Sequence, residues 1–114
     1  MKNPKKLLNL AAKMARLTKD NRSFCLGAVA IRNDDVMVYA YNGHARVPEP
    51  AAHCEARLAR KLDKGATVYL VRLTKDGEWA MSKPCVDCMR ALRRKDVNKI
   101  YYSIGPKEWA SLTF

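Results

Sequence analysis

Hydrophobic positions in the first part of the chain change from a helical to a strand-like spacing. From about residue 4 to residue 19 apolar side chains recur every three or four positions, which predicts an amphipathic helix. Two apolar runs rich in β-branched residues follow, Phe24 to Arg32 and Val36 to Tyr41, and each predicts a strand. The Asn33-Asp34-Asp35 segment between them has residues that hairpin turns favour, so the two strands are expected to pair.

The second half of the chain predicts alternating helices and strands. The expected elements are, in order, a helix over about 51–63, a buried strand over 66–73, a polar turn-like segment over 74–79, a helix from Pro84 to about Lys95, a strand over 99–104, and a final strand over 109–114. Only Gly105-Pro106-Lys107 separates the last two strands. A parallel return needs a dozen or more residues, so the final strand is expected to be antiparallel.

Together these elements indicate an α/β domain built in three layers, with a mixed sheet of four to five strands between helices. Its 114 residues form a single domain, 1–114, and the hydrophobic fraction of 48% is that of a globular protein. No apolar run approaches the roughly 20 residues that span a bilayer, and Lys13 and Arg16 interrupt the N-terminal segment. We therefore expect a soluble, cytoplasmic protein without a membrane partner.

The net charge of +11 is the unusual bulk property of the sequence. A basic surface attracts phosphates, whether on a free nucleotide or along a polymer. The positive residues are spread over several segments, however, so a solvated surface without a partner explains them equally well. Without an export signal, the four cysteines are expected to be thiols rather than disulfides.

Two short segments have the residues and spacing of a catalytic zinc centre. His53-Cys54-Glu55 lies near the start of one expected helix, and Pro84-Cys85-Val86-Asp87-Cys88 opens another. Together they match the pattern H-x-E…P-C-x-x-C of zinc-dependent deaminases. The two cysteines are three residues apart in the first turn of a helix, so both sulfurs can reach one point, and the helix dipole favours their thiolates.

His53, Cys85 and Cys88 are the predicted zinc ligands, and three protein ligands leave one tetrahedral position for water. Glu55 is two residues from His53, so it projects elsewhere and is free to act as the general acid and base. Cys54 follows His53 directly, so on a helix its side chain points in a different direction and it is a poor zinc ligand. It is expected to fill a small space beside the substrate.

These motifs, with Cys25 to Ile31, Tyr41-Asn42-Gly43 and Gly65 to Tyr69, resemble the cytidine and deoxycytidylate deaminase superfamily, especially its small virus- or phage-type members. The resemblance implies a mixed sheet flanked by helices and hydrolytic deamination of cytosine with release of ammonia. It also implies that Asn42 contacts the substrate and that Ala28 lies beside the base. Family members of this kind commonly complete the pocket from a neighbouring subunit, so a homodimer or homotetramer is expected.

Two further residues are candidate substrate contacts. Trp79, in the loop before the zinc cysteines, has a ring that can stack on a base, although packing on its own domain explains it nearly as well. Ser82 lies in the same loop, two residues before Pro84.

Three functions remain open at this point. The first is deamination of a free cytosine nucleoside or nucleotide. Deoxycytidylate deaminases usually have a longer insertion before the zinc histidine, so the short segment from His44 to Ala52 weakens the assignment of a nucleotide substrate in particular. The second is deamination of cytosine in single-stranded nucleic acid, which the charge favours. The third is a non-catalytic zinc module that binds nucleic acid, with Cys25 or Cys54 as a fourth ligand; Glu55 argues against it because a structural site has no use for that carboxylate. Adenine remains a minor alternative substrate.

Overall fold

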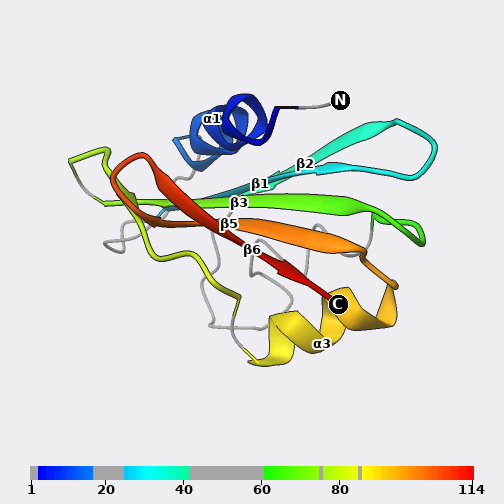
Figure 1. Ribbon diagram of the computed structural model, residues 1–114. Helices are drawn as coiled ribbons and strands as arrows, with labels where there is room; N and C mark the ends of the chain where they lie inside the picture. The colour runs from blue at the N-terminus through cyan, green and yellow to red at the C-terminus, as the bar shows by residue number, and fades with distance from the viewer. Residues whose placement is uncertain (1–2, 17–24, 42–60, 75, 85) are drawn as a thin grey trace, which may run out of the picture.

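The computed structural model describes residues 3–16, 25–41, 61–74, 76–84 and 86–114. Within them, two helices and six strands follow one another along the chain, as Figure 1 shows. The elements are α1 (Pro4–Ala15), β1 (Cys25–Ile31), β2 (Met37–Tyr41), β3 (Thr67–Leu73), β4 (Trp79–Ala80), α3 (Val86–Arg94), β5 (Lys99–Gly105) and β6 (Glu108–Thr113).

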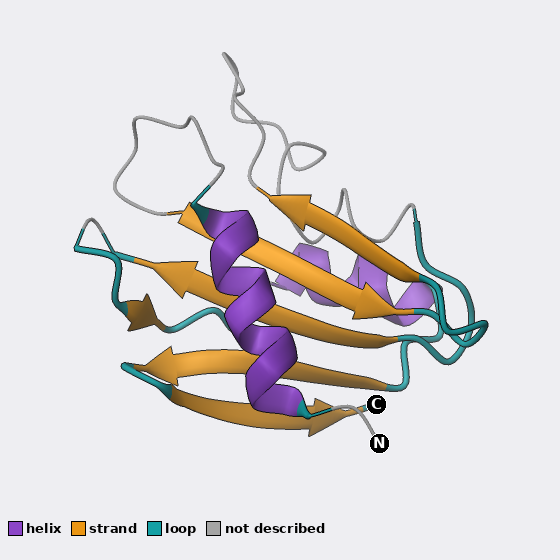
Figure 2. Ribbon diagram, turned by 90° about the horizontal axis from the view of Figure 1, so that it is seen from above, coloured by secondary structure: helices purple, strands orange, loops and turns teal. Residues whose placement is uncertain are grey.

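The strands form one mixed sheet in the order β2-β1-β3-β5-β6, with β4 paired to β3. Only β3 and β5 pair in parallel, and the segment between them contains α3. The remaining pairs are antiparallel, including β5 with β6, which confirms the expected direction of the last strand. Since α1 covers one face and α3 the other, the three-layer architecture is confirmed (Figures 1 and 2).

Alternation along the strands gives each face its own hydrophobic core. Val68 and Leu70 of β3 point to the core on the α3 face, whereas Val71 and Leu73 point to the core under α1. The buried stripe of α1 consists of Leu7, Leu8, Ala11, Ala12 and Ala15. Small side chains dominate its second half, so the helix backbone there lies directly on the sheet.

The described helix α1 is shorter than the sequence predicts. It begins at Pro4 as expected, with the Asn3 side chain accepting a hydrogen bond from the Lys5 N–H at 3.0 Å. It ends at Ala15 rather than near residue 19, and Arg16 is its C-cap. The apolar repeat predicts which side of the helix is buried more reliably than where the helix stops.

The hairpin between β1 and β2 forms where its turn residues predict it. Asp35 takes a left-handed backbone conformation, with φ of 66°, and the Arg32 N–H donates to the Val36 carbonyl at 2.8 Å. From across the fold, Asp63 Oδ1 accepts a hydrogen bond from the Asn33 N–H at 2.9 Å. Asp63 is the last residue of the helix expected over 51–63, but residues 61–63 are turn and loop rather than helix, so this bond ties a loop to the hairpin. The rest of that expected helix lies outside the described residues.

β4 is the element that the sequence analysis does not predict. The segment 74–79 was expected to be a polar turn, and its first part is one, since the Gly77 N–H donates to the Thr74 carbonyl. Trp79 and Ala80 then pair with Leu73 and Arg72 of β3. The sheet therefore has six strands rather than four or five, because a two-residue strand is too short for a periodic pattern.

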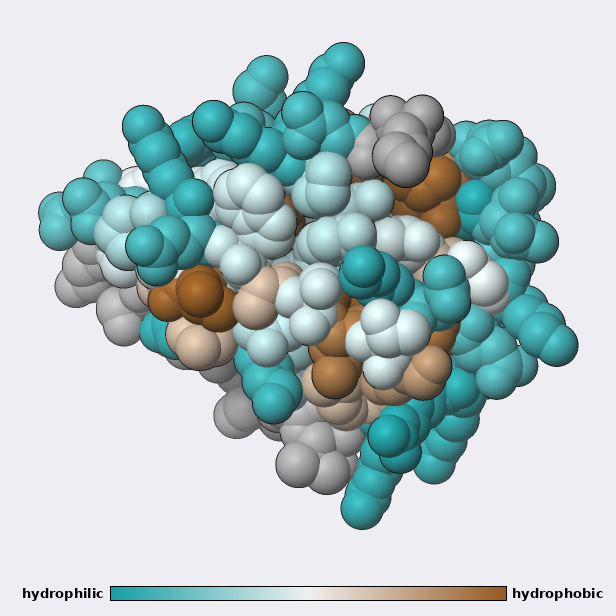
Figure 3. Space-filling view, in the orientation of Figure 1, coloured by the Kyte–Doolittle hydropathy of each residue, from teal (hydrophilic) through white to brown (hydrophobic). Residues whose placement is uncertain are grey.

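Hydrophilic residues cover most of the face seen in Figure 3. Figure 3 shows polar side chains projecting along the upper edge, over α1, with small and separate hydrophobic patches between them. No helix among the described residues is long and apolar enough to cross a membrane.

Candidate functional site

α3 and the segment before it occupy the sheet face opposite α1. Leu92 is completely buried in the core of this face, and Met89 and Ala91 pack against the same core. The backbone of Cys88 lies in the first turn of α3, as the Cys-x-x-Cys spacing predicts. Ala28 of β1 belongs to the same core and has no exposed surface.

A buried pair of serines fixes the segment that leads into α3. Ser82 is 4% exposed and Ser103 of β5 is completely buried. The Ser103 N–H donates to Ser82 Oγ at 2.8 Å, and the Ser82 N–H donates to the Ser103 carbonyl at 2.9 Å. The Ser82 hydroxyl reaches the Leu70 carbonyl at 3.1 Å. The Cys-x-x-Cys motif begins three residues after Ser82, so these bonds fix the chain just before the motif against the sheet.

The second serine adds bonds to β4 and a second bond to β3. Ser103 Oγ donates to the Ala80 carbonyl at 2.6 Å and accepts a hydrogen bond from the Arg72 N–H at 3.2 Å. The two hydroxyl oxygens are 2.8 Å apart. A buried polar network of this kind specifies one arrangement because each member would otherwise be unsatisfied.

We expect Ser82→Ala to destabilise the protein by about 2 kcal/mol, because the buried Ser103 N–H loses its acceptor. Urea unfolding followed by circular dichroism measures the change. Ser111→Ala, at an exposed position of β6, is the matched control and should shift stability by less than about 0.5 kcal/mol. Equal stabilities for the two variants would contradict the role assigned to this network.

Most of the predicted zinc centre lies outside the described residues. This holds for Asn42, His53, Cys54, Glu55 and Cys85, and for Cys88 the structure describes the backbone alone. In the part of the chain that is described, no group of three or more His, Cys, Asp or Glu side chains is placed to hold a metal ion. The ligand set therefore rests on the sequence pattern and on the position of α3.

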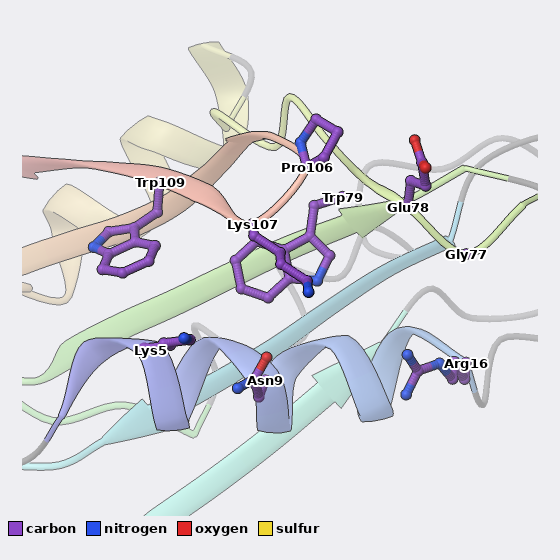
Figure 4. Close-up of a pocket in the computed structure, with 9 residues that line it drawn as sticks. All are labelled: Lys5, Asn9, Arg16, Gly77, Glu78, Trp79, Pro106, Lys107 and Trp109. Atoms are coloured by element: carbon purple, nitrogen blue, oxygen red, sulfur yellow. The ribbon is translucent and has the colours of Figure 1, made fainter.

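Trp79 lies on the other side of the sheet from Ala28 and α3. It pairs with Leu73 and packs against the core under α1. There it lines a groove together with residues of α1 and of the turn between β5 and β6, as Figure 4 shows. Because the sheet separates it from α3, we leave Trp79 out of the site proposed below.

Comparison with known families identifies the chain. The family model for the cytidine and deoxycytidylate deaminase zinc-binding region matches residues 1–104. The chain belongs to this deaminase family. The matched range includes the whole pattern from His53 to Cys88, so the resemblance drawn from those motifs is confirmed at the level of the family.

Solved structures show the same fold. A cytidine deaminase from Mycobacterium leprae superposes with a TM-score of 0.68 at 17% sequence identity, covering 97% of this chain and 94% of that one. The cytidine deaminase from Mycobacterium tuberculosis gives a TM-score of 0.59, also at 17% identity, over 90% of this chain and 85% of that one. At such identities the likeness shows the fold alone. A search of curated proteins found no match.

Two features of the structure escape the sequence analysis. Ser82 was considered only as a substrate contact, whereas its hydroxyl bonds to Leu70 and Ser103 of the sheet. The groove beside α1 joins residues from both ends of the chain and its middle, so no local pattern reveals it. The sequence features that point to such a groove are the net charge of +11 and the two tryptophans in so small a chain.

Proposed function

We propose that this protein catalyses the hydrolytic deamination of cytosine in a free nucleoside or nucleotide, giving the uracil form and ammonia. The observation that carries the proposal is the family match over residues 1–104, a range that includes all the residues given roles below. The fold shared with two cytidine deaminases is one on which this reaction is carried out in those proteins.

The donor atoms of the motif suit zinc. One imidazole nitrogen from His53 and two thiolates from Cys85 and Cys88 are the N and S ligands that zinc prefers, and a set of three is typical of catalytic centres. The start of α3, where the backbone of Cys88 lies, also favours thiolates electrostatically. When bound, zinc acts as a Lewis acid that makes water a better nucleophile near neutral pH.

The remaining steps belong to residues of the chain. The Glu55 carboxylate accepts a proton from the attacking water, delivers it to the ring nitrogen of cytosine, and then assists the departure of ammonia. Asn42 hydrogen-bonds the sugar or the base. Ala28, whose side chain is small and fully buried on this face, leaves room beside the base, and Cys54 fills the adjacent space. Ser82 holds the loop before Cys85 in place.

We also propose that the protein is a homodimer or homotetramer. A domain of 114 residues has few side chains with which to enclose a nucleoside, and a neighbouring subunit supplies the missing wall. Light scattering coupled to gel filtration gives the subunit number.

A substrate panel tests the function. Purified protein loaded with zinc is incubated with cytosine, cytidine, deoxycytidine, their monophosphates, adenosine and a cytosine-containing oligonucleotide, and released ammonia is measured. We expect turnover of at least one free cytosine nucleoside or nucleotide, at a rate above that for the oligonucleotide. Activity on the oligonucleotide alone would favour the polynucleotide-editing alternative, and no activity on any cytosine compound would overturn the proposal.

A further inference from the structure

The α1 face of the sheet has a groove that the proposed deamination does not use. It has a volume of about 470 Å³, within the range typical of ligand sites. The residues that line it come from α1, from the segment that leads into β4, and from the turn and first residues of β6. They are Lys5, Asn9, Arg16, Gly77, Glu78, Trp79, Pro106, Lys107 and Trp109 (Figure 4).

Both tryptophans of the protein line this groove. Trp109 of β6 is 37% exposed, which is unusual for so large an apolar side chain. Trp79 is half-buried and packs against the core under α1. Two indoles that line one groove, one of them exposed, offer surfaces on which flat rings can stack (Figure 4).

Two tyrosines of neighbouring strands belong to the core on the same face of the sheet. Tyr69 and Tyr101 stack with their ring centres 5.0 Å apart, and Lys99 Nζ lies 4.9 Å from the centre of the Tyr101 ring. Burial, and then the neighbouring Tyr101, raises the pKa of Tyr69 above its ordinary value near 10, so its phenol stays neutral.

Most of the charged side chains that line the groove are positive. Lys5, Arg16 and Lys107 line the groove, whereas Glu78 is the one carboxylate among its described lining residues. Lys5 and Asn9 of α1 fall on one stripe with its C-cap Arg16, since positions i, i+4 and i+11 share a helix face. At 1.5 Å per residue, Lys5 and Arg16 are about 16 Å apart along the axis. That span fits several successive phosphates better than a single one.

We propose that this groove binds single-stranded nucleic acid. Unpaired bases stack on Trp109, with Trp79 as the floor, while Lys5, Arg16 and Lys107 contact the phosphates. Proteins that bind single strands without sequence preference combine a basic groove with stacking aromatics in this way. The proposal also accounts for part of the net charge of +11. Because the sheet lies between the groove and α3, this site is separate from the deaminase site and does not depend on the proposed function.

Intrinsic fluorescence provides the test, since both tryptophans of the chain line the groove. Oligothymidylate and oligouridylate of about twelve nucleotides are titrated into the full chain at low salt. Neither contains cytosine, so neither is deaminated during the titration, and the pair distinguishes DNA from RNA. We expect saturable quenching by at least one of them, weakening steeply as salt rises. A duplex of the same length should bind at least ten-fold more weakly, because its bases are already stacked.

Three variants assign binding to the groove. Trp109→Thr, which keeps a strand-forming residue at an exposed position, should weaken binding about ten-fold or more, and Trp109→Tyr should restore most of it. Lys5→Ala with Arg16→Ala should also weaken binding and lower the salt slope by about 2. The matched control is Lys64→Ala with Lys95→Ala, which removes the same charge from exposed positions outside the groove. Glu55→Gln should bind as the unchanged protein does.

Several results would overturn the proposal. One is an equal loss of binding in the control pair, which would mean diffuse surface charge only. Others are equal affinity for the duplex or for a mononucleotide, or no quenching by either oligonucleotide. If the chain instead self-associates through this face, light scattering would show Trp109→Thr reducing the mass while neither oligonucleotide quenches the unchanged protein.

Discussion

Glu55→Gln is expected to lower the rate of cytosine deamination by roughly 100-fold to 10,000-fold, the range typical of losing a general acid–base. Glutamine has nearly the same size as glutamate and forms hydrogen bonds, but it neither accepts nor delivers the proton that the ring nitrogen needs. Because Glu55 is not a proposed ligand, the zinc content should remain close to one ion per chain. Released ammonia gives the rate, and elemental analysis of the same sample gives the metal.

Cys88→Ser is the comparison that separates proton transfer from metal binding. This variant should lose both zinc and activity, because a serine hydroxyl replaces one of the two thiolates. A Glu55→Gln protein within a few-fold of the original rate would show that the carboxylate is not the proton carrier. A Cys88→Ser protein that kept its zinc would remove Cys88 from the ligand set while leaving the family assignment intact.

Gly27→Ala should be the most destabilising of the single-methyl changes considered for this chain. A Cβ at this position would collide with the carbonyl oxygen of Ala11 and the backbone nitrogen of Ala15, and would lie 3.0 Å from the Ala15 Cα. These are backbone atoms of α1, so no side chain can rotate away. The helix must move off the sheet instead, and we expect a loss of about 3 kcal/mol. Thermal unfolding should show a midpoint lower by roughly 10 °C.

Gly105→Ala is the matched control for the glycine. A Cβ there would meet only the Glu108 carboxylate, at an ordinary distance of 3.7 Å. Its stability should therefore change by less than about 0.5 kcal/mol. If both variants melted at the temperature of the original protein, the close approach of α1 to β1 would be wrong.

Much of the fold follows from local pattern. The strands over 25–31, 37–41 and 67–73 begin and end within one residue of their predicted bounds, because short apolar runs rich in β-branched residues are a local signal. The length of the connection from β5 to β6 was enough to predict that these strands run antiparallel. β4 was missed because two residues cannot show a period. The pairing of β4 depends on β3, which the turn after Leu73 brings beside it.

The candidate site divides in the same way. The zinc motif was found because its ligands lie in short segments with fixed spacing, which the family match takes in whole. The pairing of Ser82 with Ser103 joins residues 21 positions apart, and neither serine is unusual in sequence. Trp79 shows the same limit, because the face of the sheet on which it lies is decided by its register with Leu73. Side-chain chemistry is visible in the sequence, but the surface to which a side chain belongs is decided by pairing.

β3 has a consequence for how the two faces of this protein depend on each other. Its side chains alternate between the two cores, with Leu70 in one and Val71 in the other. Because β3 belongs to both cores, one core cannot unfold while the other stays folded. The domain should therefore unfold as one cooperative unit. Any ligand that binds the folded chain on one face then stabilises the whole domain, including the opposite face. The sheet keeps the two surfaces apart in space while linking them in free energy.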